Sequence, residues 1–212
     1  MPKPKNNQLP IKENHEKFIN RLRLKVTDRE LVLIDWAYIN AKYGHRNQQR
    51  DDGSRYFDHL RSTALILIDE LKIFDSEMII SALMHDMLED SFLFDTKRIK
   101  ILFGKKVAKM VNQLSMPEMN IKIFKSKKDR LDHYHATIKK SPLKVIIIKL
   151  CDRLHNLRTM NNCPPEKRKR KTKETLDHYL PLIRLLNNDY PEIATIFYHE
   201  YEKSLDELTK TT

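Results

Sequence analysis

Glycine is almost absent from this chain: only three of its 212 residues are glycine. Tight turns between β-strands rely on glycine for backbone angles that other residues rarely adopt, so a turn-rich β-architecture is disfavoured. Leucine, isoleucine, lysine and glutamate are abundant, and apolar residues recur at helical spacing along most of the chain. We therefore predict an all-α fold, a bundle of helices around one core.

The length of the chain limits the number of domains. With 212 residues, of which 40% are hydrophobic, it can bury one full core but is short for two. Residues 1–15 are polar and rich in proline, lysine and asparagine. We expect a flexible N-terminal tail over residues 1–15 and a single domain over residues 16–212.

Capping residues and apolar periodicity divide this domain into helices. Thr27 or Asp28 can cap one helix and Asp75 or Ser76 another, while Ser141-Pro142 is typical of a helix start with Ser141 as the cap. The lone tryptophan, Trp36, is expected in the core. We expect two helices within 16–41 and further helices over 57–71, 77–89, 96–103, 105–114, 129–139, 143–160, 165–187 and 191–208.

The charge of the chain points to an anionic partner. Its formal net charge is +11, which attracts polyanions, whether nucleic acid or a nucleotide that carries several phosphates. The basic segment 122–130 can approach such phosphates, whereas the segment 167–171 is interpreted as a solvated helix start. Two cysteines, no apolar signal core and no run long enough to span a membrane predict a cytoplasmic protein.

Four side chains can together form one metal site. They are His59, the adjacent pair His85 and Asp86, and Asp152. Two imidazoles and two carboxylates can hold a divalent ion and leave coordination positions open for water and substrate. Since these residues fall on three different predicted helices, we expect the helices to converge on one ion, as in metal sites at the centre of helical bundles.

Residues one helical turn beyond these ligands supply further polar groups. On a continuous helix Glu89 lies above His85 and Asp90 above Asp86, so two more carboxylates face the site. A carboxylate near a metal-bound water can orient it, accept its proton or protonate a leaving group. Beyond Asp152 the same face offers three side chains suited to a ribose or a base, namely His155, Asn156 and Thr159.

These motifs resemble the HD superfamily of metal phosphohydrolases, and within it the (p)ppGpp hydrolase domain of RelA/SpoT homologues in its stand-alone form, the small alarmone hydrolases. The resemblance is strongest over residues 30–187. A His-Asp-x-x-Glu-Asp motif runs from His85 to Asp90. The family's Lys-Leu-Ala-Asp-Arg-Leu-His-Asn motif is matched from Lys149 onward and continues to Thr159, with Cys151 in the alanine position. The opening loop motif of the family is matched by His45, Gln48, Arg50, Gly53, Tyr56 and His59.

The resemblance implies an HD-domain helical bundle with a metal site between helices. It implies one Mn2+ ion bound by His59, His85, Asp86 and Asp152, although such a site also accepts Fe2+, Co2+ or Zn2+. It further implies catalysis by Glu89 and Asp90, and nucleoside contacts from Arg50, Asn156 and Thr159. The implied reaction removes the 3′-diphosphate of (p)ppGpp to give GDP or GTP and pyrophosphate.

Departures from the family pattern leave other substrates open. Asn47 stands where the family usually has glycine, Arg55 replaces a proline, and Asp51-Asp52 replaces Lys-Ser. A second hypothesis is therefore the same chemistry on another phosphorylated nucleotide, such as (p)ppApp or NADPH. A third is a non-catalytic basic protein that binds nucleic acid or a ligand, which the complete set of metal ligands argues against. The oligomeric state is left open.

Overall fold

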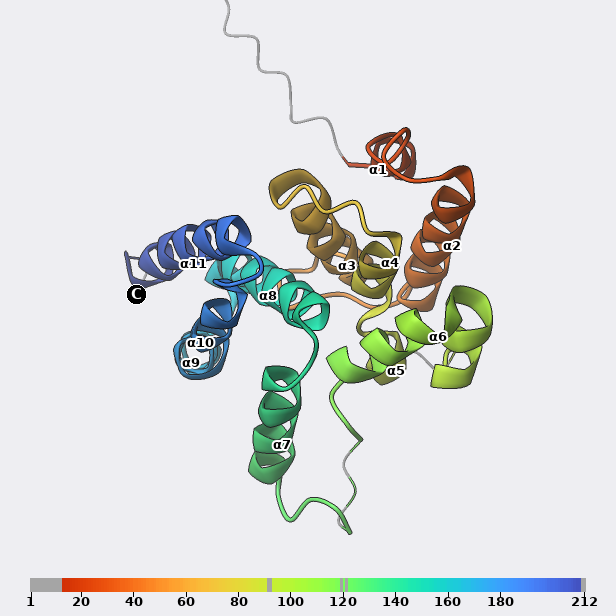
Figure 1. Ribbon diagram of the computed structural model, residues 1–212. Helices are drawn as coiled ribbons and strands as arrows, with labels where there is room; N and C mark the ends of the chain where they lie inside the picture. The colour runs from red at the N-terminus through yellow and green to blue at the C-terminus, as the bar shows by residue number, and fades with distance from the viewer. Residues whose placement is uncertain (1–12, 91–92, 119, 121, 211–212) are drawn as a thin grey trace, which may run out of the picture.

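The computed structural model describes residues 13–90, 93–118, 120 and 122–210, and most of these residues are helical (Figure 1). Within those ranges the one pairing of extended backbone is an isolated bridge between Gln49 and Arg55. The predicted all-α fold is therefore confirmed. Most of the predicted tail, residues 1–12, lies outside the described residues, and the first helix already begins at His15.

The N-terminal half of the fold begins with helices whose caps were visible in the sequence. Thr27 and Glu30 form a reciprocal capping box at the start of the second helix, and Asp75 caps the fourth. Within α6, Gly104 adopts φ 90° and ψ 168°, so two predicted helices meet at a kink there. The helices of this half are α1 (His15–Asn20), α2 (Asp28–Gly44), α3 (Tyr56–Leu65, continued as a π-helix over Ile66–Glu70), α4 (Ser76–Met84), α5 (Met87–Asp90) and α6 (Thr96–Leu114).

The C-terminal half consists of three continuous helices and a segmented one that precedes the last of them. From α9 to Leu186 the chain stays helical but changes its hydrogen-bonding pattern, from α to π, back to α and then to 3-10, before a turn leads into α11. The helices are α7 (Lys127–Lys139), α8 (Leu143–Arg158, followed by a 3-10 turn over Met160–Asn162), α9 (Pro165–Glu174), a π-helix (Thr175–Tyr179), α10 (Leu180–Ile183), a 3-10 turn (Arg184–Leu186) and α11 (Pro191–Lys210).

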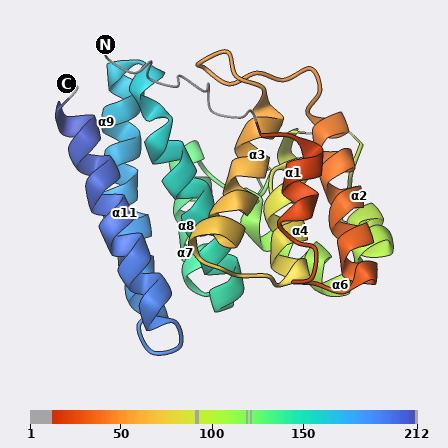
Figure 2. The ribbon, with the colours of Figure 1, turned by 90° about the horizontal axis from the view of Figure 1, so that it is seen from above.

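Helix α8 forms the centre of the fold. It packs against α3, α4, α6, α7 and α11, and Figure 2 shows it between the α3–α4 group and the α9–α11 group. Its apolar residues, such as Val145, Ile148 and Leu154, are buried, and so is the free thiol of Cys151. Among the described residues, no helix combines the length and the apolar character needed to cross a membrane. Because α8 is surrounded in this way, its polar residues Asp152 and Arg153 are buried inside the protein.

Three sequence-based expectations are wrong. The helix predicted over residues 77–89 is interrupted at His85 and Asp86, because the His85 carbonyl accepts from Ser115 Oγ while the Glu89 amide donates to Asp86. Ser141 does not cap α8, because its hydroxyl donates to the Thr137 carbonyl in the preceding helix. Trp36 lies on the outer side of α2 and is 53% exposed, so it is not a core residue.

Candidate metal centre

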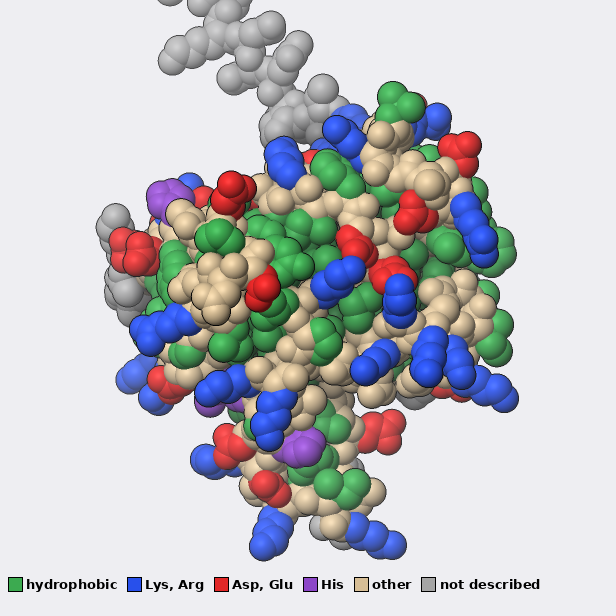
Figure 3. Space-filling view, in the orientation of Figure 1, with side chains coloured by type: hydrophobic (Ala, Val, Ile, Leu, Met, Phe, Trp, Pro, Cys, Tyr) green, Lys and Arg blue, Asp and Glu red, His purple; other side chains and the backbone are tan. Residues whose placement is uncertain are grey.

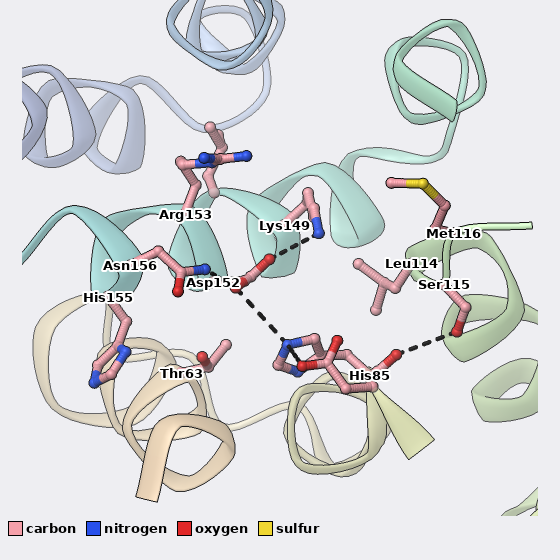
Figure 4. Close-up of polar contacts among 12 residues, drawn as sticks. Thr63, His85, Leu114, Ser115, Met116, Lys149, Asp152, Arg153, His155 and Asn156 are labelled. Carbon is pink, nitrogen blue, oxygen red and sulfur yellow. Dashed lines mark hydrogen bonds and ion pairs between the residues drawn. The ribbon is translucent and has the colours of Figure 1, made fainter. Parts of the chain in front are cut away.

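Helices α3 and α8 and the end of α4 bring three predicted ligands together. One donor atom from each of His59, His85 and Asp152 lies within 4.8 Å of the others, and all three side chains are buried. The fourth predicted ligand is close by: Oδ2 of Asp86 lies 3.3 Å from Nε2 of His85 and 4.0 Å from Nε2 of His59. In Figure 4, Asp152 on α8 is directed toward His85. The predicted convergence of three helical segments is thus present in the structure.

The hydrogen bonds of His85 leave one ring nitrogen available for a cation. Its Nδ1 lies 2.8 Å from the carbonyl oxygen of Ala82, which can only accept, so Nδ1 carries the proton. Its buried Nε2 faces the two carboxylates without an acceptable hydrogen bond to any described residue. A buried nitrogen lone pair beside two carboxylates and a second imidazole is a donor set that fits a divalent transition metal.

Both carboxylates of the cluster are held in the ionised form. Burial alone would raise the pKa of Asp152, but the charge of Lys149 is the largest of the effects that outweigh it and hold that pKa well below its usual range. For Asp86, burial is outweighed by the charge of His85, which lowers the pKa of this carboxyl as well. Reciprocally, although burial opposes it, Asp86 raises the pKa of His85 to about 9, so without a cation Nε2 also holds a proton, and a bound cation would take the place of that proton. The cluster is therefore electrostatically suited to a cation.

His59, Asp86 and Asp152 line a cavity of about 350 Å³, within the size range of small-molecule sites. Arg50, Asn156 and Thr159 line it as a connected group: Nη2 of Arg50 donates to Oδ1 of Asn156 at 2.8 Å and to Oγ1 of Thr159 at 3.3 Å. Arg50 is held by a turn in which its amide donates to the Ser54 carbonyl and Gly53 takes φ 77°. The three predicted nucleoside contacts therefore lie together on one wall.

Of the two predicted catalytic carboxylates, the structure describes the side chain of Glu89 but not that of Asp90. Glu89 lines the cavity, and its Oε1 accepts a 2.7 Å hydrogen bond from the backbone amide of Met116. Asp90 is the last residue of α5, and its side chain lies outside the described part of the structure. The i+4 alignment expected for these residues is altered, because the helix is interrupted at His85 and Asp86.

Besides Arg50, four lysine and arginine side chains contribute to the lining of the cavity. Lys149, Arg153, Lys167 and Lys171 all line it, although Glu174 pairs with Arg153 at 2.8 Å and with Lys171 at 2.7 Å. Segment 167–171 does lie at the start of a helix, as expected, but Lys167 and Lys171 also face the cavity. The i+4 spacing of these two lysines was the signal that they share a face.

The other basic segment lies away from the cavity. None of the described residues of segment 122–130 lines it, and Phe124 anchors the loop by packing near His133. Figure 3 shows cationic side chains at the end of the projection that α7 forms. Over the rest of this face, Lys and Arg are interspersed with acidic side chains.

Comparisons with known proteins agree with this geometry. Residues 37–186 match the family model described as the HD domain. The chain is 36% identical over 152 residues to the bifunctional (p)ppGpp synthase/hydrolase SpoT of Escherichia coli K12, and 33% identical over 152 residues to the guanosine-3′,5′-bis(diphosphate) 3′-pyrophosphohydrolase of Haemophilus influenzae. Each match covers 71% of this chain but only 21% and 22% of those relatives, so the chain spans about a fifth of their length.

A solved structure shares the fold. It is described as a metazoan orthologue of SpoT that hydrolyzes ppGpp and plays a role in starvation responses. It superimposes with a TM-score of 0.68 at 22% sequence identity, over 81% of this chain and 94% of that one. The match of the family model over most of the chain shows that the chain belongs to the HD domain family.

Proposed function

We propose that this chain is a Mn2+-dependent phosphohydrolase that removes the 3′-diphosphate of (p)ppGpp, giving GDP or GTP and pyrophosphate. The observation that carries the proposal is the presence in one cavity of a buried His/Asp cluster, a polar wall suited to a nucleoside and a wall of cations suited to phosphates. The names of the relatives from Escherichia coli and Haemophilus influenzae specify hydrolysis of this class of nucleotide and support the assignment.

In this proposal His59, His85, Asp86 and Asp152 hold the cation. When bound, a divalent cation supplies Lewis acidity and makes a water molecule acidic enough to act as a nucleophile near neutral pH. Tyr56 assists by donating a 2.8 Å hydrogen bond to Oδ2 of Asp86, which limits the rotation of that carboxylate. Mn2+ is the expected ion because the resemblance implies it, and the donor set is compatible with it.

Glu89 and Asp90 move protons in the proposed reaction. The Met116 amide holds the carboxylate of Glu89 at the edge of the cavity, where it can accept a proton from the attacking water. Asp90 is assigned to the leaving group because its place in the His-Asp-x-x-Glu-Asp motif implies a catalytic role.

The substrate lies between the polar and the cationic walls. Arg50, Asn156 and Thr159 offer donors and acceptors to the base and the ribose. Lys171 and Arg153 also line the cavity, where their charges can offset those of the phosphates in a low-dielectric site. The pKa of Lys171 is lowered, first by burial and then by the nearby charge of Arg153, so an anionic ligand would relieve a repulsion that already exists.

The test is product analysis with purified protein, ppGpp and Mn2+, with and without EDTA. Formation of GDP and pyrophosphate that stops on chelation supports the proposal, and parallel reactions with Fe2+, Co2+ and Zn2+ rank the metals. (p)ppApp and NADPH serve as competing substrates, because the pairing of Asp51 with Lys167 beside the cavity departs from the family pattern. A clear preference for either competitor rejects the assigned substrate, and protein that binds no divalent ion rejects the metal site.

A further inference from the structure

The two ring nitrogens of His59 face different surroundings. Nε2 lies 3.1 Å from Oδ1 of Asp152 and 4.0 Å from Oδ2 of Asp86, so it points into the metal cluster. Nδ1 points away from the cluster and lies 2.8 Å from Nδ1 of His155. The two rings are tilted by 50° with their centroids 4.8 Å apart, so this contact joins them edge to edge rather than by stacking.

A contact of 2.8 Å between two imidazole nitrogens is a hydrogen bond in which one nitrogen donates and the other accepts. If His59 carries its proton on Nε2, that proton is directed at Asp152 and the nitrogen cannot bind a cation. If His59 carries its proton on Nδ1, then His155 Nδ1 is the acceptor and the lone pair on Nε2 of His59 is available. The partner at Nδ1 therefore decides whether His59 can act as a ligand.

His85, the neighbouring proposed ligand, has a different kind of hydrogen-bond partner at Nδ1. Nδ1 of His85 donates to the backbone carbonyl of Ala82, an acceptor that no substitution removes. Histidines that bind metals usually have such a partner, which fixes the tautomer and the orientation of the ring. For His59 the corresponding partner is a side chain, and it can be tested by mutation.

We propose that His155 is a positioning residue, whose Nδ1 accepts the Nδ1 proton of His59 and thereby keeps Nε2 of His59 available for the cation. This inference rests on the proposed metal site. It replaces the expectation that His155 contacts a ribose or a base, because His155 is not among the residues that line the cavity.

The position of His155 suits this role. It lies on α8, one turn beyond Asp152, so a single helix supplies both a proposed ligand and the partner of another ligand. The backbone there is fixed, since the carbonyl of His155 accepts from the amide of Thr159 at 3.2 Å and from its hydroxyl at 3.0 Å. The ring of His155 is therefore presented to His59 by a rigid element rather than by a loop.

The test compares two variants of the full chain, His155→Leu and His155→Asn. Leucine preserves much of the bulk but cannot accept a hydrogen bond, whereas the amide oxygen of asparagine can occupy the position of Nδ1 and accept. We expect His155→Leu to weaken Mn2+ binding by about 10- to 100-fold and His155→Asn to stay close to the wild type. His199→Leu is the matched control, because that side chain on α11 is 76% exposed, and its Mn2+ affinity should not change.

Mn2+ affinity is measured by electron paramagnetic resonance of the free ion, and thermal unfolding without metal checks the fold. If both variants bind Mn2+ as tightly as the wild type, the positioning role of His155 is overturned while the metal site itself stands. Equal loss in both variants assigns His155 to packing and also overturns that role. A wild-type chain that binds no Mn2+ overturns the metal site, and with it this inference.

A second measurement needs no variant. In the Zn2+-loaded wild type, two-bond proton–nitrogen correlation by NMR should place the His59 proton on Nδ1. A proton on Nε2 in that complex would contradict the proposal even if His155→Leu failed to fold.

Discussion

Nζ of Lys149 lies 2.7 Å from Oδ2 of Asp152, one turn further along α8, and both side chains are almost fully buried. The other oxygen of this carboxylate, Oδ1, faces Nε2 of His59 at 3.1 Å and accepts from Nδ2 of Asn156 at 2.6 Å. One oxygen of the Asp152 carboxylate therefore pairs with Lys149, and the other faces the proposed metal site. Removing the carboxylate disturbs both functions, and the two effects can be separated.

Asp152→Asn should lower Mn2+ affinity on the order of 100-fold or more, because it removes an anionic ligand. It should also destabilise the metal-free protein by about 3 kcal/mol, because Lys149 is left buried without a counter-charge. The double variant Asp152→Asn/Lys149→Met should recover stability but not metal binding. Urea unfolding and Mn2+ titration measure the two effects. Wild-type Mn2+ affinity in Asp152→Asn would remove this residue from the site.

Glu89→Gln should retain Mn2+ binding and lose turnover. The amide oxygen of glutamine can still accept from the Met116 amide, so the side chain keeps its place while it loses the ability to take up a proton. We expect kcat to fall by about 10²- to 10⁴-fold. The control is Glu118→Gln, an exposed residue two positions beyond Met116. An unchanged kcat would exclude Glu89 from proton transfer.

Arg50→Lys should weaken substrate binding without affecting the metal. Lysine keeps the charge but cannot reproduce the guanidinium geometry that joins Asn156 and Thr159. We expect KM to rise by roughly 10-fold or more, as for the loss of a hydrogen bond to a charged group, with unchanged Mn2+ affinity. Arg55→Lys, in the same loop but paired with Asp58, is the matched control. A change in Mn2+ affinity rather than KM would place Arg50 in the metal site instead.

The pairing of Glu174 with Arg153 should make stability depend on pH. Burial would raise the pKa of Glu174, but hydrogen bonding to His135 and the charges of Arg153 and Lys171 outweigh it and hold the pKa below its unfolded value of 4.5. Ionised Glu174 therefore stabilises the folded state above pH 4.5. This contribution is lost as the pH falls from 4.5 through the lower pKa that Glu174 has in the folded protein.

Glu174→Gln tests this directly. At pH 7 the variant should be less stable by about 3 kcal/mol, because Arg153 is 6% exposed and loses its ionic partner. Between pH 5 and pH 3 the wild type should lose more stability than the variant. Urea unfolding at several pH values measures both. Parallel losses in the two proteins would show that another carboxyl group is responsible.

Gly104→Ala should destabilise the fold by about 1–3 kcal/mol. The backbone of Gly104 takes φ 90° and ψ 168°, a region that residues with a Cβ atom rarely enter, although no neighbouring atom lies within 4 Å of an added Cβ. The cost is therefore conformational rather than steric. Lys105→Ala, at an exposed position next to it, is the control and should have little effect. Equal melting temperatures for both variants would show that the kink can relax.

Much of the fold could be read from the sequence because helix starts and stops are local. The capping box of Thr27 and Glu30 involves residues three apart, and the kink at Gly104 depends on the conformational freedom of one residue. The metal site could be anticipated for a related reason. Its residues occur in short motifs on separate helices, and the structure brings His59, His85 and Asp152 together as expected.

The features of the fold and the site that could not be predicted depend on contacts between segments that are far apart in the sequence. The His85 carbonyl, at the end of α4, lies 3.2 Å from the hydroxyl of Ser115, and His155 contacts His59 rather than lining the cavity. The packing of the helical segment that follows α8 sets Lys171 in the cavity wall although Lys169 is exposed. The sequence by itself determined which residues form helices and which can bind a metal, because both depend on residue type and short spacing. Only tertiary packing decided which atom of each side chain faces the proposed metal site and which atom faces a neighbouring residue. This depends on partners up to about a hundred residues away in the sequence.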